Sequence, residues 1–211
     1  MKFFSYESRF SQIMLKICSG CYLNLLWFVF SIPVFTVGAS STALFSVTLK
    51  IARDENPRLF LDFVKAFRDN FKQATVLWLI MLGFGMVLGI DGYILYHLYQ
   101  TYTGPIGVIC TLGLALIIAA AIAYVITLMY LFPLTASVKN TNFNMLKNSL
   151  LNGIHYLFCT ILMFAIYFAM FFAVVAVFTP LIIFGFGLCA LVCSYLLTGV
   201  IRAVSYVEEA E

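Results

Sequence analysis

The sequence has few charged residues: 10% of its 211 residues are Asp, Glu, Lys or Arg, whereas 64% are hydrophobic. A typical soluble domain has roughly a quarter charged residues and about half apolar ones. Such a small polar surface cannot cover a core of this size, so most apolar side chains must face lipid or one another. The composition excludes an ordinary soluble domain, and the long unbroken apolar runs predict membrane-spanning α-helices, which satisfy their own backbone polar groups.

Sequence motifs of enzymes are also missing. The chain contains no HExxH zinc helix, no GxxxxGK[ST] phosphate loop and no GxSxG nucleophile elbow. Its apolar segments contain neither a pair of carboxylates nor a Cys/His cluster that could hold a metal. We therefore expect no enzymatic activity, no catalytic residue, no cofactor, no metal and no nucleic-acid partner. A removable signal peptide is not expected either, because no small-x-small cleavage site follows the first apolar run.

Apolar runs long enough to cross a bilayer occupy residues 73–98, 105–132, 151–177 and 180–204. Residues 14–51 are predicted to form a helical hairpin, because Pro33 would break a single helix. An N-terminal interfacial segment, 1–13, precedes this hairpin. The predicted fold is thus all-α, a single transmembrane domain over residues 1–211 with about six spans. A re-entrant first pair is the alternative.

The positions of the basic residues predict the orientation, because cytoplasmic loops carry an excess of Lys and Arg. With six crossings, all twelve basic residues fall on one side, whereas the opposite turns near Pro33, Thr103 and Pro180 carry none. We therefore expect a multi-pass protein of a bacterial cytoplasmic membrane, with the lipid bilayer as its main partner and both termini in the cytoplasm.

Residues 56–72 are predicted to form a cytoplasmic amphipathic helix that begins at Asn56-Pro57. Phenylalanines recur at spacings of three and four along it, and charged residues fall largely on the opposite side. One interpretation is a helix that lies on the inner leaflet. The other is a docking helix for a cytoplasmic partner, with a candidate docking face made of Phe60, Phe63, Lys65 and Phe67.

Polar residues are rare inside the spans. Asn24 is the best candidate for a buried polar contact, either an interhelical hydrogen bond or a substrate contact. Asp91, His97 and His155 are expected near the membrane interfaces, because an ionisable group at mid-depth is costly. Gly83, Gly85, Gly89 and Gly92 in the third span, and Gly185 and Gly187 in the sixth, are expected to permit close helix approach.

The segment Leu23–Trp27, followed by Ile32–Gly38 and Thr42–Leu44, resembles the signature of the YesL-like family of small bacterial membrane proteins. Residues 67–74 resemble the second signature of that family, and the length and span pattern are also similar. The resemblance therefore covers nearly the whole chain. It marks seven residues as signature positions: Asn24, Trp27, Pro33, Thr36, Gly38, Asn70 and Phe71.

The resemblance implies only a broad role, because the family is a domain of unknown function. Its members tend to be encoded beside oligosaccharide ABC importers and carbohydrate-degrading enzymes. This association implies an accessory component of carbohydrate uptake that contacts ABC importer subunits or another membrane partner. The chain does not resemble the permease itself, because residues 53–72 lack the Glu-Ala-Ala pattern that docks an importer ATPase. The alternatives are a small channel or carrier and a membrane scaffold or signalling protein, and a homo-oligomer is possible.

Overall fold

The computed structural model describes the backbone of residues 9–102, 104–176 and 182–208. These residues form seven α-helices and one 3-10 turn and contain no strand, which confirms the all-α prediction. Six of the helices are long and apolar enough to cross a membrane. The elements are α1 (Arg9–Phe30), η1 (Val34–Thr36), α2 (Val37–Ala52), α3 (Leu59–Thr101), α4 (Pro105–Ser137), α5 (Asn142–His155), α6 (Leu157–Ala176) and α7 (Ile182–Glu208).

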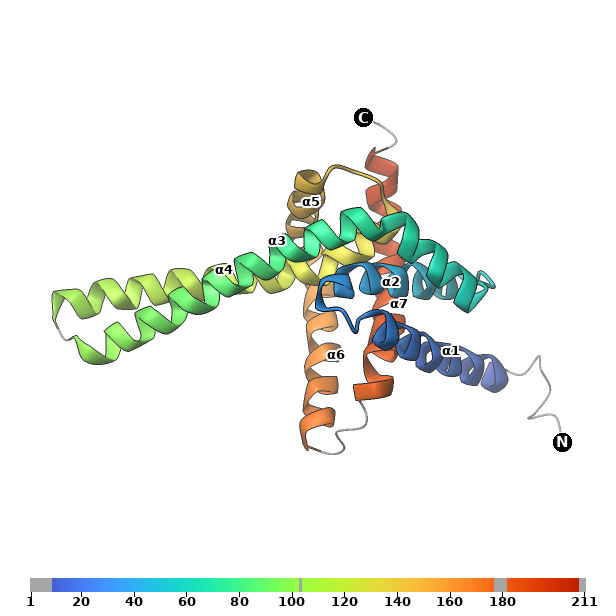
Figure 1. The fold of residues 1–211 in the computed structure, drawn as a ribbon, viewed down its shortest axis with the longest axis horizontal. Helices are drawn as coiled ribbons and strands as arrows, with labels where there is room; N and C mark the ends of the chain where they lie inside the picture. Colours follow the sequence, from blue (N-terminus) through green and yellow to red (C-terminus); the bar gives the residue numbers. More distant parts are fainter. Residues whose placement is uncertain (1–8, 103, 177–181, 209–211) are drawn as a thin grey trace.

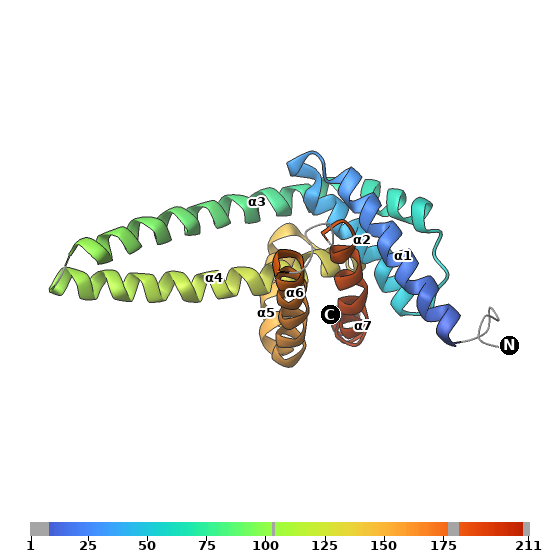
Figure 2. The same ribbon diagram turned by 90° about the horizontal axis from the view of Figure 1, so that it is seen from below.

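The helices are arranged in two directions. Helices α3 and α4 form a long hairpin that projects far beyond the rest of the chain, and α1 and α2 lie near the start of α3 (Figure 1). Helices α6 and α7 pack together and run steeply across the α3–α4 hairpin, as the two views agree (Figures 1 and 2). In this conformation the hairpin and the α6–α7 pair cannot both stand perpendicular to one flat bilayer.

Helix α3 is one continuous helix of 43 residues, where the sequence predicted a cytoplasmic helix, 56–72, and a separate span, 73–98. No proline or glycine lies between its start and Gly83, so nothing in this stretch interrupts the helix. It begins at Leu59, and the carboxylate of Asp62 accepts a hydrogen bond from the Arg58 N–H at 3.2 Å. At 1.5 Å per residue the helix is about 64 Å long, roughly twice the hydrocarbon core of a bilayer.

Helix α2 lies at the centre of the molecule and contacts α1, α3, α4 and α7. Its small and aliphatic side chains, such as Ala39, Ala43 and Val47, are fully buried. Three of its hydroxyl groups, those of Ser40, Thr42 and Thr48, donate to carbonyls one turn earlier, as in the bond from Thr48 Oγ1 to the Leu44 carbonyl at 3.0 Å. The Thr48 hydroxyl also lies 2.8 Å from the Ser194 hydroxyl, which ties α2 to α7.

The predicted span 151–177 is divided differently in the structure. Helix α5 continues to His155, and α6 begins at Leu157 after a non-helical Tyr156. The last predicted span, 180–204, corresponds to α7, Ile182–Glu208. Residues 177–181, residue 103 and most of the predicted interfacial segment, 1–8, lie outside the described residues, whereas residues 9–13 belong to α1.

Candidate functional site

Four of the signature residues build the turn between α1 and α2. Pro33 precedes the short 3-10 turn, and the Thr36 hydroxyl lies 2.7 Å from both the Phe30 and the Pro33 carbonyl oxygens. Near the end of α1, Trp27 Nε1 donates a hydrogen bond to Ser41 Oγ at 3.0 Å, which joins α1 to α2. The last of the four, Gly38, lies at the start of α2 and faces α3. These contacts hold the two helices in one tight hairpin.

This hairpin is wedged against the middle of α3. A Cβ atom on Gly38 would lie 2.5 Å from the Ala74 carbonyl oxygen and 2.5 Å from the Trp78 Cβ, so only glycine permits this approach. Trp78 Nε1 donates a hydrogen bond to the Val34 carbonyl at 2.8 Å. At the other end of α2, Lys50 forms an ion pair with Asp62 at 3.4 Å. Helix α2 therefore runs antiparallel to the charged first half of α3.

The position of the turn limits how deep the first hairpin can reach. Beyond Trp78, residues 79–101 of α3 extend about 34 Å further, which is enough to cross a hydrocarbon core of roughly 30 Å. The far half of the hairpin consists of α3 and α4 and projects beyond α1 and α2, as Figure 1 shows. A bilayer placed around residues 79–101 would leave the Pro33 turn near its surface. By length and composition, α1 and α2 are both among the six helices that could cross a membrane.

Asn24 lies in the contact between α1 and α7 and is 1% exposed. Its side-chain oxygen accepts a hydrogen bond from the Gly187 N–H at 2.8 Å. The backbone of α7 comes so close that a Cβ atom on Gly187 would collide with the Gly20 carbonyl oxygen and the Asn24 Cβ. The structure therefore gives Asn24 an interhelical hydrogen bond, and Gly187 permits close helix approach as predicted. The same prediction is wrong for Gly83 and Gly89 of α3, where a Cβ atom would meet nothing within 4 Å.

The remaining signature residues lie within α3. Asn70 Nδ2 donates a hydrogen bond to the Ala66 carbonyl at 3.0 Å. The ring of Phe71 lies 5.3 Å from that of Phe67, measured between centroids. Both contacts are internal to α3.

The four residues of the predicted docking face differ in accessibility. Phe63 is fully buried, and Phe67 packs against it from one turn along α3. The ring of Phe30 covers both, at centroid distances of 5.4 Å and 5.0 Å. Phe60, at 49% exposure, and Lys65 remain accessible. The spacing of the phenylalanines identified the apolar face but could not show that the end of α1 lies on it.

The accessible surface on the first half of α3 shares Phe60 and Lys65 with the predicted docking face but otherwise consists of other residues. We call it the outer face of α3 and define it by the residues that line one shallow cavity of about 360 Å³: Phe60, Leu61, Val64, Lys65, Arg68 and Asp69. It combines apolar side chains with charges of both signs. The same half of α3 therefore has a phenylalanine stripe packed on α1 and a separate mixed surface that nothing covers among the described residues.

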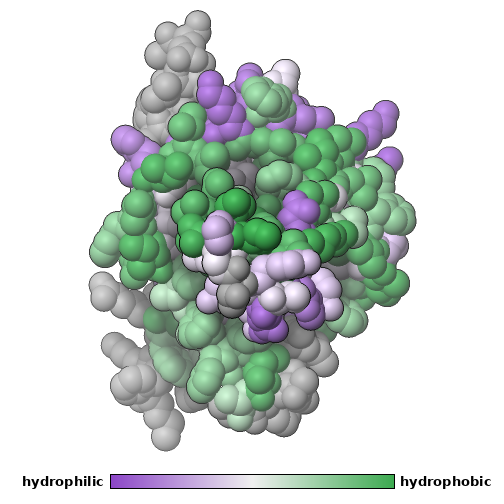
Figure 3. Space-filling model, turned by 90° about the vertical axis from the view of Figure 1, so that its left-hand side faces the viewer, coloured by the Kyte–Doolittle hydropathy of each residue, from purple (hydrophilic) through white to green (hydrophobic). Residues whose placement is uncertain are grey.

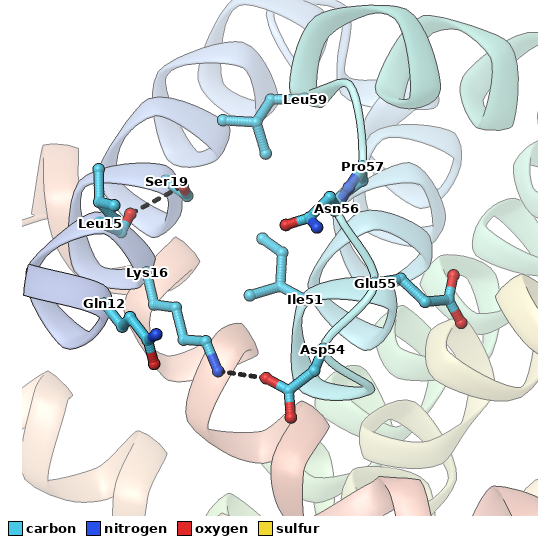
Figure 4. A pocket seen from close by; sticks show the side chains of 10 residues that line it. All are labelled: Gln12, Leu15, Lys16, Ser19, Ile51, Asp54, Glu55, Asn56, Pro57 and Leu59. Carbon is cyan, nitrogen blue, oxygen red and sulfur yellow. Dashed lines mark hydrogen bonds and ion pairs between the residues drawn. The ribbon is translucent and has the colours of Figure 1, made fainter. Parts of the chain in front are cut away.

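A polar cleft of about 630 Å³ lies next to the outer face of α3, between the first turns of α1 and the loop from α2 to α3 (Figure 4). Lys16 from α1 and Asp54 from the loop point toward each other across it, with Nζ and Oδ1 2.7 Å apart. Asn56 and Gln12 add amide groups, whereas Glu55 points away. This pairing could not be predicted from the sequence, because Lys16 and Asp54 are 38 positions apart.

Asp54 holds an unusual backbone conformation, with φ at +57°. Its N–H donates to the Ile51 carbonyl, and the N–H of Glu55 donates to the Lys50 carbonyl, which is the Schellman pattern at the end of a helix. Glycine is the usual residue at this position. An aspartate at this position forms the ion pair with Lys16, which links the loop to α1.

The described residues of the cleft offer charged and hydrogen-bonding groups, and among them no nucleophile lies beside a base. The Ser19 hydroxyl donates to the Leu15 carbonyl of its own helix at 2.8 Å, and no histidine or cysteine lines the cleft. Over the described part of the chain, no group of three His, Cys, Asp or Glu residues could hold a metal. The arrangement can hydrogen-bond a polar ligand or a partner's loop, but it lacks a nucleophile with an adjacent base.

The far half of the α3–α4 hairpin presents a very different surface. Figure 3 looks at the molecule from this end and shows mainly hydrophobic residues, with a small group of hydrophilic ones near the centre. Ile90, Ile109, Leu112 and Leu116 are each at least 60% exposed. An exposed apolar surface of this kind marks a membrane or protein interaction site, and the length and composition of both helices suit a membrane.

No curated protein and no solved structure matches this chain. A family model does match about a third of it. The matched segment runs from Cys21 through the α1–α2 turn and α2 to Gly92 in α3, so it contains every signature residue described above. Residues 21–92, which form the wedge of α2 and the Pro33 turn against α3, match the model of the family described as "Protein of unknown function, DUF624".

Proposed function

We propose that this chain is a non-enzymatic membrane protein that works through contact with a protein partner, as an accessory component of oligosaccharide uptake beside an ABC importer. The observation that carries this proposal is the outer face of α3. Phe60 and Leu61 are 49% and 57% exposed there, on the charged half of the helix rather than on its apolar half. Large apolar side chains beside charges of both signs suit a groove on another protein.

The polar cleft supports the same proposal. Leu59, which lines the cleft, directly precedes Phe60 and Leu61 of the outer face, so the two surfaces lie at the start of the same helix, although they point in different directions. Ion pairs and amides at the rim with apolar anchors beside them are typical of protein interfaces. The carbohydrate importer as the partner rests on the family resemblance alone, and the matching family model adds no function.

The proposal also includes the orientation of the chain. The outer face of α3, the cleft and the basic residues around them would lie on the cytoplasmic side of a bacterial cell membrane, together with both termini. A partner at this position would be a cytoplasmic ATPase subunit or the cytoplasmic loop of a permease. The far half of the α3–α4 hairpin would lie in lipid.

A crosslinking experiment in native membranes tests the partner. Tagged wild-type chain is expected to yield importer subunits by mass spectrometry from cells grown on an oligosaccharide. Replacing both Phe60 and Leu61 by alanine should lower that yield at least tenfold, because truncated apolar anchors at an interface commonly cost 1–2 kcal/mol or more each. The matched control replaces Phe143 and Leu151, two exposed residues of α5, by alanine.

Two outcomes would contradict the proposal. One is that the wild-type chain recovers no importer subunit. The other is that the α5 control lowers the yield as much as the α3 variant. A yield from the α3 variant equal to that of the wild type would leave the importer as the partner but would show that the outer face of α3 is not the docking surface.

A further inference from the structure

An apolar cavity of about 370 Å³ opens where the two sets of helices meet. Its wall contains aromatic residues from α1, α3, α4, α6 and α7, together with Val125 of α4. The indole N–H groups of Trp27 and Trp78 already donate to Ser41 and to the Val34 carbonyl, so they present their apolar rings. A volume of this size is typical of a small-molecule site. Apart from the hydroxyl groups of Ser41 and Tyr167 its lining is apolar, which suits a hydrocarbon chain.

A second, smaller cavity of about 220 Å³ lies between α2, α3 and the end of α4. Three lysines and two aspartates line it. Lys50 is paired with Asp62 at 3.4 Å, whereas Lys65 and Lys139 take part in no ion pair with any residue that the structure describes. Asp69 is the one remaining anion of the lining. Two ammonium groups are thus available here for a negatively charged ligand.

The two cavities adjoin along the same helices. On α2, Phe45 lines the apolar cavity and the next residue, Ser46, lines the charged one. On α4, Phe132 lines the first and Ala136 the second, one helical turn or about 6 Å further along. Trp78 lines the apolar cavity, and it lies where the residues along α3 change from charged to apolar. A charged cavity therefore lies next to an apolar one at the level expected for the membrane surface.

We infer that these two cavities form one binding site for a phospholipid, with an acyl chain in the apolar cavity and the phosphate between Lys65 and Lys139. An acyl chain gains little by leaving a bilayer for an apolar wall, because lipid tails are as apolar as leucine. Selection must therefore come from the headgroup, and a basic pocket between helices at the cytoplasmic surface is a known means of holding one. This inference does not depend on the proposed protein partner.

Native mass spectrometry of the purified chain tests the site. The probes are phosphatidylglycerol and a glucosyl diacylglycerol with the same acyl chains but no phosphate. Wild-type protein is expected to retain phosphatidylglycerol in preference to the glucosyl diacylglycerol. The ratio of retained phosphatidylglycerol to retained glucosyl diacylglycerol should fall roughly fivefold for each of Lys65 and Lys139 that is replaced by alanine. The double variant should therefore show no preference. Val125→Trp, which fills the apolar cavity, should reduce retention of phosphatidylglycerol without changing either lysine.

Matched controls leave both cavities intact. Lys72→Ala removes an exposed lysine from α3 outside the charged cavity, and Ile118→Trp adds the same indole two turns from Val125 on α4. Both should retain phosphatidylglycerol as the wild type does. Equal retention of the two lipids by wild-type protein would overturn the inference, as would unchanged retention by Val125→Trp. Stabilisation by inorganic phosphate alone, with none from the lipid, would show a free-phosphate site and also contradict it.

Discussion

Replacing Gly38 by alanine is expected to lower the free energy of unfolding by about 1–3 kcal/mol or more. The new Cβ would lie 2.5 Å from both the Ala74 carbonyl oxygen and the Trp78 Cβ. Neither atom can move away easily, because one is main chain in the middle of α3 and the other is the root of a side chain. The α1–α2 turn would have to separate from α3, which would also break the hydrogen bond from Trp78 to Val34.

Tryptophan fluorescence in detergent measures this change directly. The chain has two tryptophans, and both Trp27 and Trp78 lie beside the turn. Gly38→Ala should shift the denaturant midpoint down and move the emission of the folded state. The control is Gly89→Ala in the same α3, where a Cβ meets no atom within 4 Å. Alanine there should be neutral or stabilising by about 0.5–1 kcal/mol. Equal free energies of unfolding for Gly38→Ala and Gly89→Ala would contradict the close packing of the α1–α2 turn against α3.

Replacing Gly187 by alanine is expected to have an effect of similar size on the contact between α1 and α7. A Cβ at this position would lie 2.7 Å from the Asn24 Cβ and would also collide with the Gly20 carbonyl oxygen. Separation of the helices would leave the Gly187 N–H without the Asn24 oxygen that it now reaches at 2.8 Å. We expect a loss of about 1–3 kcal/mol in the free energy of unfolding.

The same unfolding measurement checks this second prediction, with Gly199→Ala as the control. Gly199 lies in the same helix α7, and a Cβ there meets nothing within 4 Å. Asn24→Leu removes the hydrogen bond without adding a backbone clash, so it should cost less than Gly187→Ala, about 0.5–2 kcal/mol. If Asn24→Leu were the more damaging of the two, the hydrogen bond rather than the close approach would hold α1 to α7.

Composition and run length predicted the helical membrane character of the chain well, because both depend only on local sequence. The break at Pro33 and the role of Gly187 were also readable, since proline and glycine have fixed backbone consequences. Asn24 was correctly identified as a buried polar residue. Its partner was not, because Gly187 is 163 positions away and contributes only a backbone N–H.

Other features could not be predicted from the sequence, because they depend on which helices contact one another in the fold. The stripe of Phe63 and Phe67 looked accessible until Phe30 of α1 was placed on it. The single helix from Leu59 to Thr101 was divided at the change from charged to apolar residues, although helical hydrogen bonds continue through such a change. The polar cleft and the two adjoining cavities join residues from several helices, and no spacing along the chain indicates them.

Cysteine accessibility across α4 tests the membrane account most directly. Thr101 lies exposed at the tip of the α3–α4 hairpin, and Thr141 lies exposed just after α4 ends. In intact cells a membrane-impermeant maleimide should label Thr101→Cys, whereas Thr141→Cys should react only after permeabilisation. The unmodified chain is the control for its six native cysteines. Labelling of both positions from the same side of the membrane would contradict a membrane-crossing α4.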